Sequence, residues 1–326
     1  MIELIIVSIF LNLIFFRTYE KFSNYFNIYD IPDNKRKIHI SKISNIGGFI
    51  FVINLFIFFC YKFFSHELIK DDFMPNIYIF SVLFFLIGFF DDRINLNPIL
   101  RLFLSGIIFY FLLIFNQDLL LTSINFTSLN FSINFGKYSA LVTILCVILF
   151  LNALNMFDGI NLQSAIYLIT IFSFFLINEI NEIFFLLLLI SLIFFTYYNY
   201  NNKIFLGNAG IWFCSFIISC ALIDSHNQKL ISVEMVLMLL MFPGIDMLRV
   251  FIQRVSNGKH PFTPDKNHIH HLLLKSLNQT KAVFLIFLSY FIPILLFVFT
   301  SRFIFSLSIL VLMYLIIFLK FKNIKN

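Results

Sequence analysis

The sequence predicts an all-α integral membrane protein that crosses a lipid bilayer about eleven times. Of its 326 residues, 60% are hydrophobic, 19% are aromatic and only 12% are charged, and 49 are phenylalanine. The apolar residues form continuous runs that could cross a membrane, instead of the single stripe of an amphipathic helix. The 23 Lys and Arg residues fall 18 against 5 on alternate loops. By the positive-inside rule, this asymmetry places the N-terminus outside and the C-terminus in the cytoplasm.

The predicted spans follow the apolar runs in order. To within several residues they cover 2–16, 46–64, 73–90, 98–116, 138–155, 162–178, 183–199, 209–224, 231–252, 282–301 and 303–319. The first run lacks a basic leader and a small-residue cleavage site, so we expect a retained span rather than a signal peptide. The polar segments are too short for a separate soluble domain, so we expect one integral-membrane domain over residues 1–326. The net charge of +6 then reflects topology and does not imply nucleic-acid binding.

Two adjacent carboxylates, Asp91 and Asp92, end the third apolar run and are followed by Arg93. Two ionised carboxylates repel each other and are costly to hold near hydrocarbon. They suit the boundary between membrane and cytosol, with a divalent cation and a phosphate group opposite them. The alternative is that they mark only the aqueous end of a membrane helix.

The first cytoplasmic loop carries three consecutive cations at 35–37, with Arg36 in the middle, and then His39. Such a group suits an anionic headgroup. The same cations could also serve as a nonspecific positive-inside anchor. Gly47 and Gly48 begin the next run and would allow a close approach of backbone or ligand.

Asn152, Asn155 and Asp158 recur every three residues at the end of the fifth run, which places them on one face of a helix. A row of amides and a carboxylate is costly in lipid, so it should face a wet cavity or the protein interior. Hydrogen bonding between helices is the alternative. Gly159 and Asn161 follow the row directly.

Asn208 stands between Gly207 and Gly210 where the eighth run begins. The backbone N–H groups at the start of a helix favour an anion. This feature is weak by itself.

The last cytoplasmic loop gathers the most hydrogen-bond donors. Lys266 precedes His268, His270 and His271, and Arg249 lies near the end of the preceding run. The cluster suits a phosphate or a nucleobase. An adventitious metal site or a solvated loop are the alternatives, although HxHH is not a usual zinc spacing and no Cys lies nearby.

These segments, in this order and on these runs, resemble the polyprenyl-phosphate N-acetylhexosamine-1-phosphate transferase family, which is glycosyltransferase family 4. The most specific stretches are residues 242–250, which read FPGIDMLRV, and residues 261–271, which read PFTPDKNHIHH. The Asp91–Asp92 pair, the polar row that ends at Gly159 and the Phe-Leu-Gly at 205–207 match the remaining signatures. The resemblance covers about residues 28–275 and is closer to the bacterial GlcNAc-1-phosphate branch than to the phospho-MurNAc-pentapeptide translocase.

Two places depart from the family pattern. Asn161 and Leu162 stand where the family usually has a second Asp-Gly pair. Asn208 stands where an Asp implicated in magnesium binding is usual. An amide oxygen can still bind Mg²⁺, but it brings one negative charge fewer, so a neighbouring Asp must compensate or the affinity for the metal should fall.

The resemblance implies an enzyme that uses Mg²⁺, with Mn²⁺ as an alternative. It implies transfer of an N-acetylhexosamine-1-phosphate from a UDP-N-acetylamino sugar to undecaprenyl phosphate, with release of UMP. It also implies the bacterial cytoplasmic membrane, a cytoplasmic active site among membrane lipids, and the first membrane step of cell-surface polysaccharide synthesis; a homodimer stays open. The implied roles are catalysis by Asp91, Asp92 and Asp158, metal binding by Asn155, Asn208 and Asp92, and substrate binding by Arg36, His39, Asn152, Asn161, Arg249, Lys266, His268, His270 and His271.

Three other functions can be weighed against this resemblance. A CDP-alcohol phosphatidyltransferase would need Ala-Arg after its Asp-Gly, whereas Ile-Asn-Leu-Gln follows Gly159 here. A transporter would place charges near the middle of the bilayer, and here they cluster at one face. A catalytically impaired homologue that serves as a lipid-binding or assembly subunit is kept open by Asn161 and Asn208.

Overall fold

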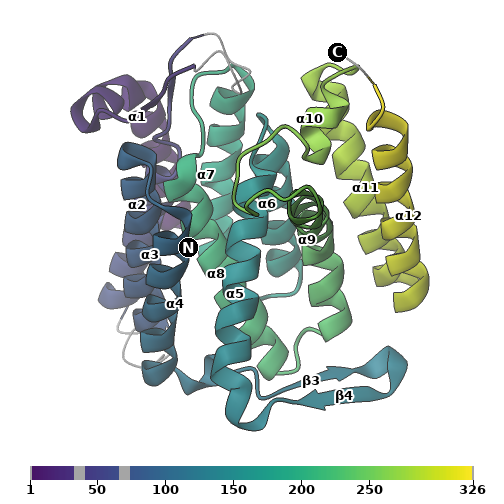
Figure 1. Cartoon of the computed structure of the whole chain (residues 1–326). Helices are drawn as coiled ribbons and strands as arrows, with labels where there is room; N and C mark the ends of the chain where they lie inside the picture. Colours follow the sequence, from purple (N-terminus) through teal and green to yellow (C-terminus); the bar gives the residue numbers. More distant parts are fainter. Residues whose placement is uncertain (1, 33–40, 66–73, 325–326) are drawn as a thin grey trace. The chain divides into compact units, whose positions relative to one another are not determined.

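The computed structural model describes residues 2–32, 41–65 and 74–324, and it is built mainly from α-helices (Figure 1). The long helices are α1 (Ile2–Phe26), α2 (Phe49–Phe64), α3 (Met74–Ile94), α4 (Pro98–Phe115), α5 (Ser139–Phe157), α6 (Gln163–Ile177), α7 (Glu182–Tyr200), α8 (Gly207–Asn227), α9 (Val233–Ser256), α11 (Gln279–Thr300) and α12 (Phe303–Phe321). A short helix, α10 (Ile269–Leu273), lies between α9 and α11. Each apolar run that the sequence analysis identified therefore contains one helix.

Eight helices of the described residues are long and apolar enough to cross a membrane: α1, α4, α5, α7, α8, α9, α11 and α12. α2 and α6 are apolar but shorter, with 16 and 15 residues. α3 has 21 residues and carries the Asp91–Asp92 pair in its last turn. The polytopic membrane architecture is confirmed, while the count of eleven spans and the orientation of the termini stay predictions.

The expectation of an all-α protein is wrong in one respect, because four short strands form two antiparallel pairs. β1 (Tyr29–Asp30) pairs with β2 (Ile43–Ser44), and β3 (Ser123–Phe126) pairs with β4 (Phe131–Asn134). The β3–β4 hairpin turns at Asn130, whose φ of 48° suits an asparagine in a tight turn. Runs of four residues with alternating polarity are too short to stand out beside membrane spans.

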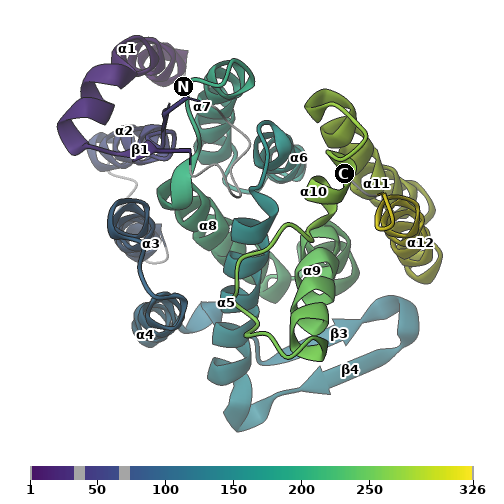
Figure 2. The same ribbon diagram turned by 45° about the horizontal axis from the view of Figure 1, so that its top comes forward.

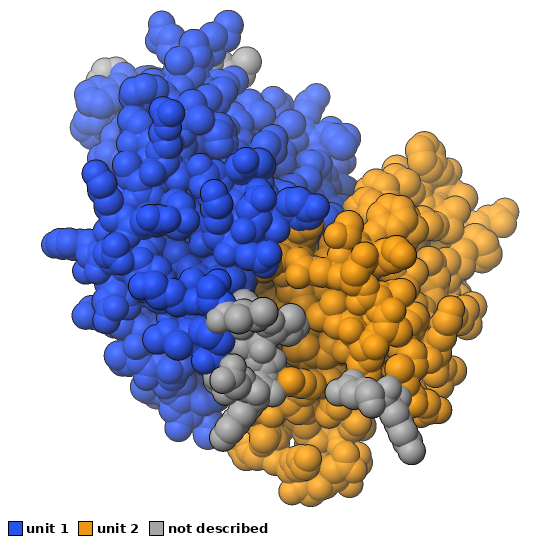
Figure 3. Space-filling model, turned by 90° about the horizontal axis from the view of Figure 1, so that it is seen from above, with its two compact units in different colours: residues 1–120, 165–221 blue, residues 121–164, 222–326 orange. Residues whose placement is uncertain are grey.

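The chain forms two compact units, which are coloured separately in Figure 3. Unit 1 contains residues 1–120 and 165–221, and unit 2 contains residues 121–164 and 222–326. Each unit is therefore assembled from two separate segments of the chain.

In unit 1, α8 is buried along most of its length and forms the core. The ring of Phe216 on α8 stacks on that of Phe84 on α3, with 4.4 Å between the ring centroids. Glycines let the helix backbones approach closely. A Cβ built on Gly48 would lie 2.3 Å from the Gly210 nitrogen, and one built on Gly88 would lie 2.4 Å from the Asn208 carbonyl oxygen.

In unit 2, α9 packs against α5, α11 and α12, and α10 contacts α11 and α12. Aromatic rings fill the centre of this unit. Phe242 of α9 lies 6.1 Å from the ring of Phe157, 5.9 Å from that of Tyr290 and 5.6 Å from that of Tyr314. The β3–β4 hairpin extends sideways from the start of α5 past α9 (Figures 1 and 2).

Candidate active site

The Asp92 carboxylate caps the first turn of α8 in unit 1. Its Oδ1 accepts a hydrogen bond from the Asn208 backbone N–H at 2.9 Å, and its Oδ2 accepts one from the Ala209 N–H at 3.0 Å. The start of a helix presents unpaired N–H groups and a partial positive charge, which stabilise a carboxylate there. The anion that the sequence predicts at this helix start is thus, in the protein itself, the side chain of Asp92.

Asp91 is buried and is surrounded by donors. Its Oδ1 accepts a hydrogen bond from the Leu96 N–H at 2.9 Å, and its Oδ2 accepts one from the Asn208 side-chain amide at 2.7 Å. The Arg101 guanidinium forms an ion pair with the same Oδ2. The sequence analysis assigned no role to Arg101, which lies in the first turn of the next helix, ten positions after Asp91.

Gly207 is required where α8 begins. Its φ is +74°, a left-handed conformation that side chains other than glycine rarely adopt. A Cβ at this position would lie 2.7 Å from Oδ2 of Asp92 and 2.7 Å from the backbone oxygen of Asn45. The glycine of the Phe-Leu-Gly signature therefore makes room for the Asp92 cap.

In unit 2, Asp158 follows the last residue of α5. The Ser164 hydroxyl donates a hydrogen bond to its Oδ1. Burial raises the pKa of the Asp158 carboxyl to about 6, although the bond from Ser164 acts in the opposite direction.

The other polar residues of this segment have different surroundings. The Asn152 amide donates to the Ile148 carbonyl of its own helix at 2.7 Å, whereas Asn155 is half-buried one turn later. Asn161 is buried, and its backbone oxygen accepts a bond from the Gln279 side chain at 3.4 Å. Leu162 has a φ of 70°, so the backbone keeps a left-handed turn where the family usually has glycine.

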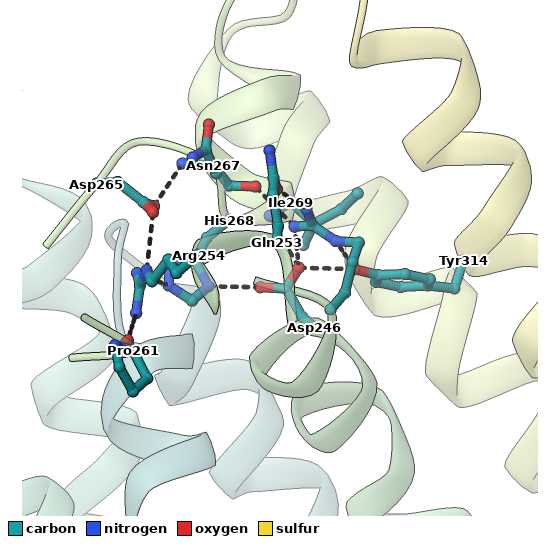
Figure 4. A network of polar contacts seen from close by, with 10 residues as sticks. Asp246, Gln253, Arg254, Pro261, Asp265, Asn267, His268, Ile269 and Tyr314 are labelled. Atoms are coloured by element: carbon teal, nitrogen blue, oxygen red, sulfur yellow. Dashed lines mark hydrogen bonds and ion pairs between the residues drawn. The ribbon is translucent and has the colours of Figure 1, made fainter. Parts of the chain in front are cut away.

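Asp246 is the centre of a polar network that joins α9 to the loop between α9 and α10 (Figure 4). Its Oδ2 lies 2.8 Å from Nδ1 of His268. Its Oδ1 accepts hydrogen bonds from the Tyr314 hydroxyl at 2.8 Å, the Arg249 guanidinium at 2.8 Å and the Ile269 N–H at 3.1 Å. The sequence analysis assigned no role to Asp246 or Tyr314.

The guanidinium group of Arg249 donates hydrogen bonds to other groups of the protein. Nε donates to the Tyr314 hydroxyl at 2.5 Å, Nη1 to Gln253 at 3.3 Å, and Nη2 to both Asp246 and the Asn267 carbonyl, the latter at 2.6 Å. The Phe318 ring lies under the guanidinium at 4.6 Å. In this arrangement Arg249 supports the loop, while its predicted contact with the substrate stays a prediction.

A second arginine holds the other end of the loop. Arg254 is buried and donates to Asp265 and to the Pro261 carbonyl at 2.8 and 2.7 Å, and its Nη2 lies 3.4 Å from Nε2 of His268. Burial alone would raise the pKa of Asp265, but the bonds from Arg254 and from the Asn267 N–H hold it below its usual value. The two arginines therefore hold the part of the loop that precedes His268, Arg254 at Pro261 and Asp265 and Arg249 at Asn267.

The three histidines lie side by side. The rings of His268 and His270 are parallel at 5.6 Å, and those of His270 and His271 are 4.3 Å apart. His270 is buried against Gly159, where a Cβ would lie 2.0 Å from its Nε2. Burial and the neighbouring histidines lower the pKa of His270 well below its usual value and that of His271 to about 4. Neutral imidazoles can accept as well as donate, so these two suit a nucleobase better than a doubly charged phosphate.

Three predicted residues remain, namely Lys266, Arg36 and His39. Lys266 is exposed beside the loop. Arg36 and His39 lie outside the described residues. The prediction that all these residues share one cytoplasmic face stays a prediction.

The fit of each centre to Mg²⁺ differs. Asp158 and Asn155 offer oxygen ligands one helical turn apart, and Mg²⁺ commonly takes one or two carboxylates and completes its shell with water and substrate phosphate. At the other centre, every carboxylate oxygen of Asp91 and Asp92 already accepts a hydrogen bond, and Asn208 turns its amide nitrogen toward Asp91. Over residues 2–32, 41–65 and 74–324, no three His, Cys, Asp or Glu side chains converge as a metal site.

Comparison with known proteins agrees with the predicted resemblance. Residues 74–226 match the family model described as glycosyl transferase family 4. The chain is 26% identical to the undecaprenyl-phosphate alpha-N-acetylglucosaminyl 1-phosphate transferase of Escherichia coli K12, over 87% of this chain and 79% of that protein. It is 28% identical to the enzymes of the same name from Haemophilus influenzae, over 81% of this chain and 76% of that protein, and from Pasteurella multocida, over 85% and 79%.

The apolar helices are those of a polytopic membrane protein, and the relatives that it resembles are named as transferases. The match to glycosyl transferase family 4 over residues 74–226 and the similarity to these enzymes support the resemblance that the sequence motifs predict.

Proposed function

We propose that this protein transfers an N-acetylhexosamine-1-phosphate from a UDP-sugar, UDP-GlcNAc or a related UDP-N-acetylamino sugar, to undecaprenyl phosphate. The observation that carries the proposal is the family match over residues 74–226, which contains Asp91, Asp92, Asp158 and Asn208. The relatives named above are all transferases of this acceptor lipid, which supports the general reaction. The reaction would be the first membrane step of a cell-surface polysaccharide, on the cytoplasmic side of the cytoplasmic membrane.

In the proposed reaction, an oxygen of the lipid phosphate attacks the phosphorus next to the sugar. A new phosphorus–oxygen bond forms, the bond to the other phosphate of the diphosphate breaks, and UMP leaves with the electron pair. Charge must be neutralised on three phosphate groups, so positioning and electrostatics carry most of the catalysis.

The residues of unit 1 are proposed to orient the lipid phosphate. Asp91 is held by Arg101 and Asn208, and Asp92 is held by the first N–H groups of α8. An incoming phosphate would compete with Asp92 for those N–H groups, because both are anions that suit a helix start. Arg36 and His39 are proposed as additional contacts to the lipid phosphate.

The residues of unit 2 are proposed to bind the nucleotide and the metal. Asp158 and Asn155 would hold Mg²⁺, which offsets the charge of the diphosphate when bound. His268 is fixed by Asp246, and the neutral His270 and His271 with Lys266 are suited to the base and phosphates of the nucleotide. Asn152 and Asn161 complete the proposed substrate contacts.

The test is release of UMP by the purified protein from a panel of UDP-sugars, with undecaprenyl phosphate and Mg²⁺. Asp91→Asn, Asp92→Asn and Asp158→Asn should each lower turnover at least about a hundredfold, which is typical of losing one preorganised electrostatic contact. Glu179→Gln at an exposed turn is the control and should leave turnover unchanged. Normal turnover by all three variants would refute the assignment of the site.

The alternative, a catalytically impaired homologue that serves as a lipid-binding or assembly subunit, predicts no UMP release with any sugar of the panel. Because the relatives are named as transferases, this alternative is not favoured.

A further inference from the structure

The β3–β4 hairpin of unit 2 has one apolar and one polar face. Residues directly opposite in an antiparallel pair point to the same side. The pairs Ile124–Ile133 and Phe126–Phe131 make the apolar face. The pairs Ser123–Asn134 and Asn125–Ser132 make the polar face. The ribbon is therefore amphipathic, although it lies outside the helical core.

Three helices hold the hairpin at the level where they begin. Glu234, in the first turn of α9, accepts hydrogen bonds from the Ser128 N–H at 2.8 Å, the Ser128 hydroxyl at 2.9 Å and the Thr127 hydroxyl at 3.1 Å. The Phe126 ring lies 6.4 Å from that of Phe303, the first residue of α12. α5 begins at Ser139, five residues after β4 ends.

These three helices are all candidate spans, so their first turns mark one boundary of the bilayer. The 19 residues of α5 rise roughly 28 Å, close to the thickness of the hydrocarbon layer of about 30 Å. In Figure 1 the hairpin runs across the direction of α5 and α9 rather than along it. It therefore extends along the membrane surface, at the end of α5 opposite to Asp158.

The apolar face is the one that packs against α12, because the Phe126 ring on this face lies beside that of Phe303. The β4 half of the same face is uncovered: Phe131 is 55% exposed and Ile133 is 39% exposed. Residues 119–136 include no charged residue. In water, an edge strand of this kind is normally guarded by Lys, Pro or a bulge, and β4 has none of these.

We propose that the apolar face of the hairpin rests on lipid, with Phe131 and Ile133 inserted at the boundary between the headgroups and the acyl chains. A peripheral amphipathic element with aromatic residues on one face is suited to this boundary. A partner protein in the aqueous phase would instead meet the polar face, which carries only Ser and Asn side chains. This membrane contact is independent of the proposed transferase reaction.

The test uses alternate faces of β4 as matched controls. Phe131→Trp and Ile133→Trp place a fluorophore on the apolar face, and Ser132→Trp and Asn134→Trp place one on the polar face of the same strand. The native Trp212 is buried in unit 1 and adds the same background to every variant. Each full-length protein is reconstituted in phosphatidylcholine vesicles with acyl chains brominated near the headgroup, and quenching is compared with that in unbrominated vesicles.

The brominated lipid should quench the added fluorescence of the apolar-face variants at least about twofold more than that of the polar-face variants. Acrylamide in the water should show the reverse order. Equal lipid quenching on both faces would overturn the proposal. Protection of the apolar-face tryptophans from both quenchers would also overturn it, in favour of a second copy or another protein covering the strand.

Discussion

The side-chain amide nitrogen of Asn208 donates a hydrogen bond to Asp91. An aspartate at position 208 could not donate this bond. Asn208→Asp would replace a donor–acceptor pair by two carboxylates, which repel each other unless a cation or a proton lies between them. Without divalent cations, we expect the variant to melt at a lower temperature than the natural protein. Addition of Mg²⁺ should raise the melting temperature of the variant more than that of the natural protein. In the UMP assay, the Mg²⁺ concentration for half-maximal rate should fall roughly fivefold or more.

Asn201→Asp is the control for this substitution, because it adds the same charge at an exposed position. An identical response to Mg²⁺ in both variants would place Asn208 outside the influence of the metal. UMP release that appears only with Asp at position 208 would mark the natural chain as a silenced transferase.

Leu162 stores backbone strain in the turn after Asp158. The φ of Leu162 is 70°, which is a left-handed conformation. This conformation costs a residue with a Cβ roughly 1–2 kcal/mol. Leu162→Gly and Leu162→Ala both remove the side chain beyond Cβ, but only glycine relieves the strain. We expect the glycine variant to be more stable than the alanine variant by about 1 kcal/mol, measured as a higher melting temperature. Equal melting temperatures would show that the turn is not strained.

The histidine loop should make the protein sensitive to acid. The pKa of His271 is about 4 in the folded protein and 6.5 in an unfolded chain, so the unfolded state binds more protons. Stability is therefore lost as the pH falls from 6.5 toward about 4, and it does not depend on this group above that window. Between about pH 7 and about pH 5, the melting temperature of His271→Gln should fall less than that of the natural protein. His260→Gln, at an exposed position of the same loop, should show the same fall as the natural protein.

At the scale of the elements, glycines set how closely the helices of unit 1 pack. An added methyl group at Gly48 or Gly88 would meet the backbone of α8 at 2.3 or 2.4 Å, and a backbone cannot rotate away. We expect Gly48→Ala and Gly88→Ala each to destabilise the protein by about 1–3 kcal/mol or more.

Gly244, inside α9, is the matched control for these two substitutions. A Cβ there would meet no atom within 4 Å. Gly244→Ala should therefore keep or raise the melting temperature, because alanine favours a helix more than glycine does by up to about 1 kcal/mol. A loss like that of the other two variants would mean that the close backbone contacts at Gly48 and Gly88 are not the cause of their destabilisation.

At the scale of the whole molecule, topology depends on the distribution of Lys and Arg. The excess of 18 over 5, of 23 in all, predicts a cytoplasmic C-terminus and an outer location for the segment 116–137. A reporter enzyme joined to the C-terminus and one inserted within that segment should report opposite sides of the membrane. The same side for both would also refute a shared cytoplasmic face for residues 31–48, 91–93, 152–161 and 259–271.

The positions of the helices could be predicted from the sequence, because the thickness of the bilayer sets the length of each apolar run. Such a run can be recognised without knowing what it packs against. The sequence also identified Asp91, Asp92, Asp158 and the histidine loop, because carboxylates and histidines beside membrane spans are costly and stand out. The hairpin was missed, since its two strands of four residues give too short a pattern.

The partners of these charged groups became evident from the folded structure alone. Asp92 caps a helix that begins more than a hundred residues later, and Asp246 takes a hydrogen bond from Tyr314, 68 residues further along. Arg101 is the one charged residue of α4, but the local pattern does not show which carboxylate it reaches, and it does not show that Tyr314 reaches Asp246. A buried carboxylate must find donors, but which donors reach it depends on how closely the helices pack, and glycines such as Gly88 and Gly207 set that distance.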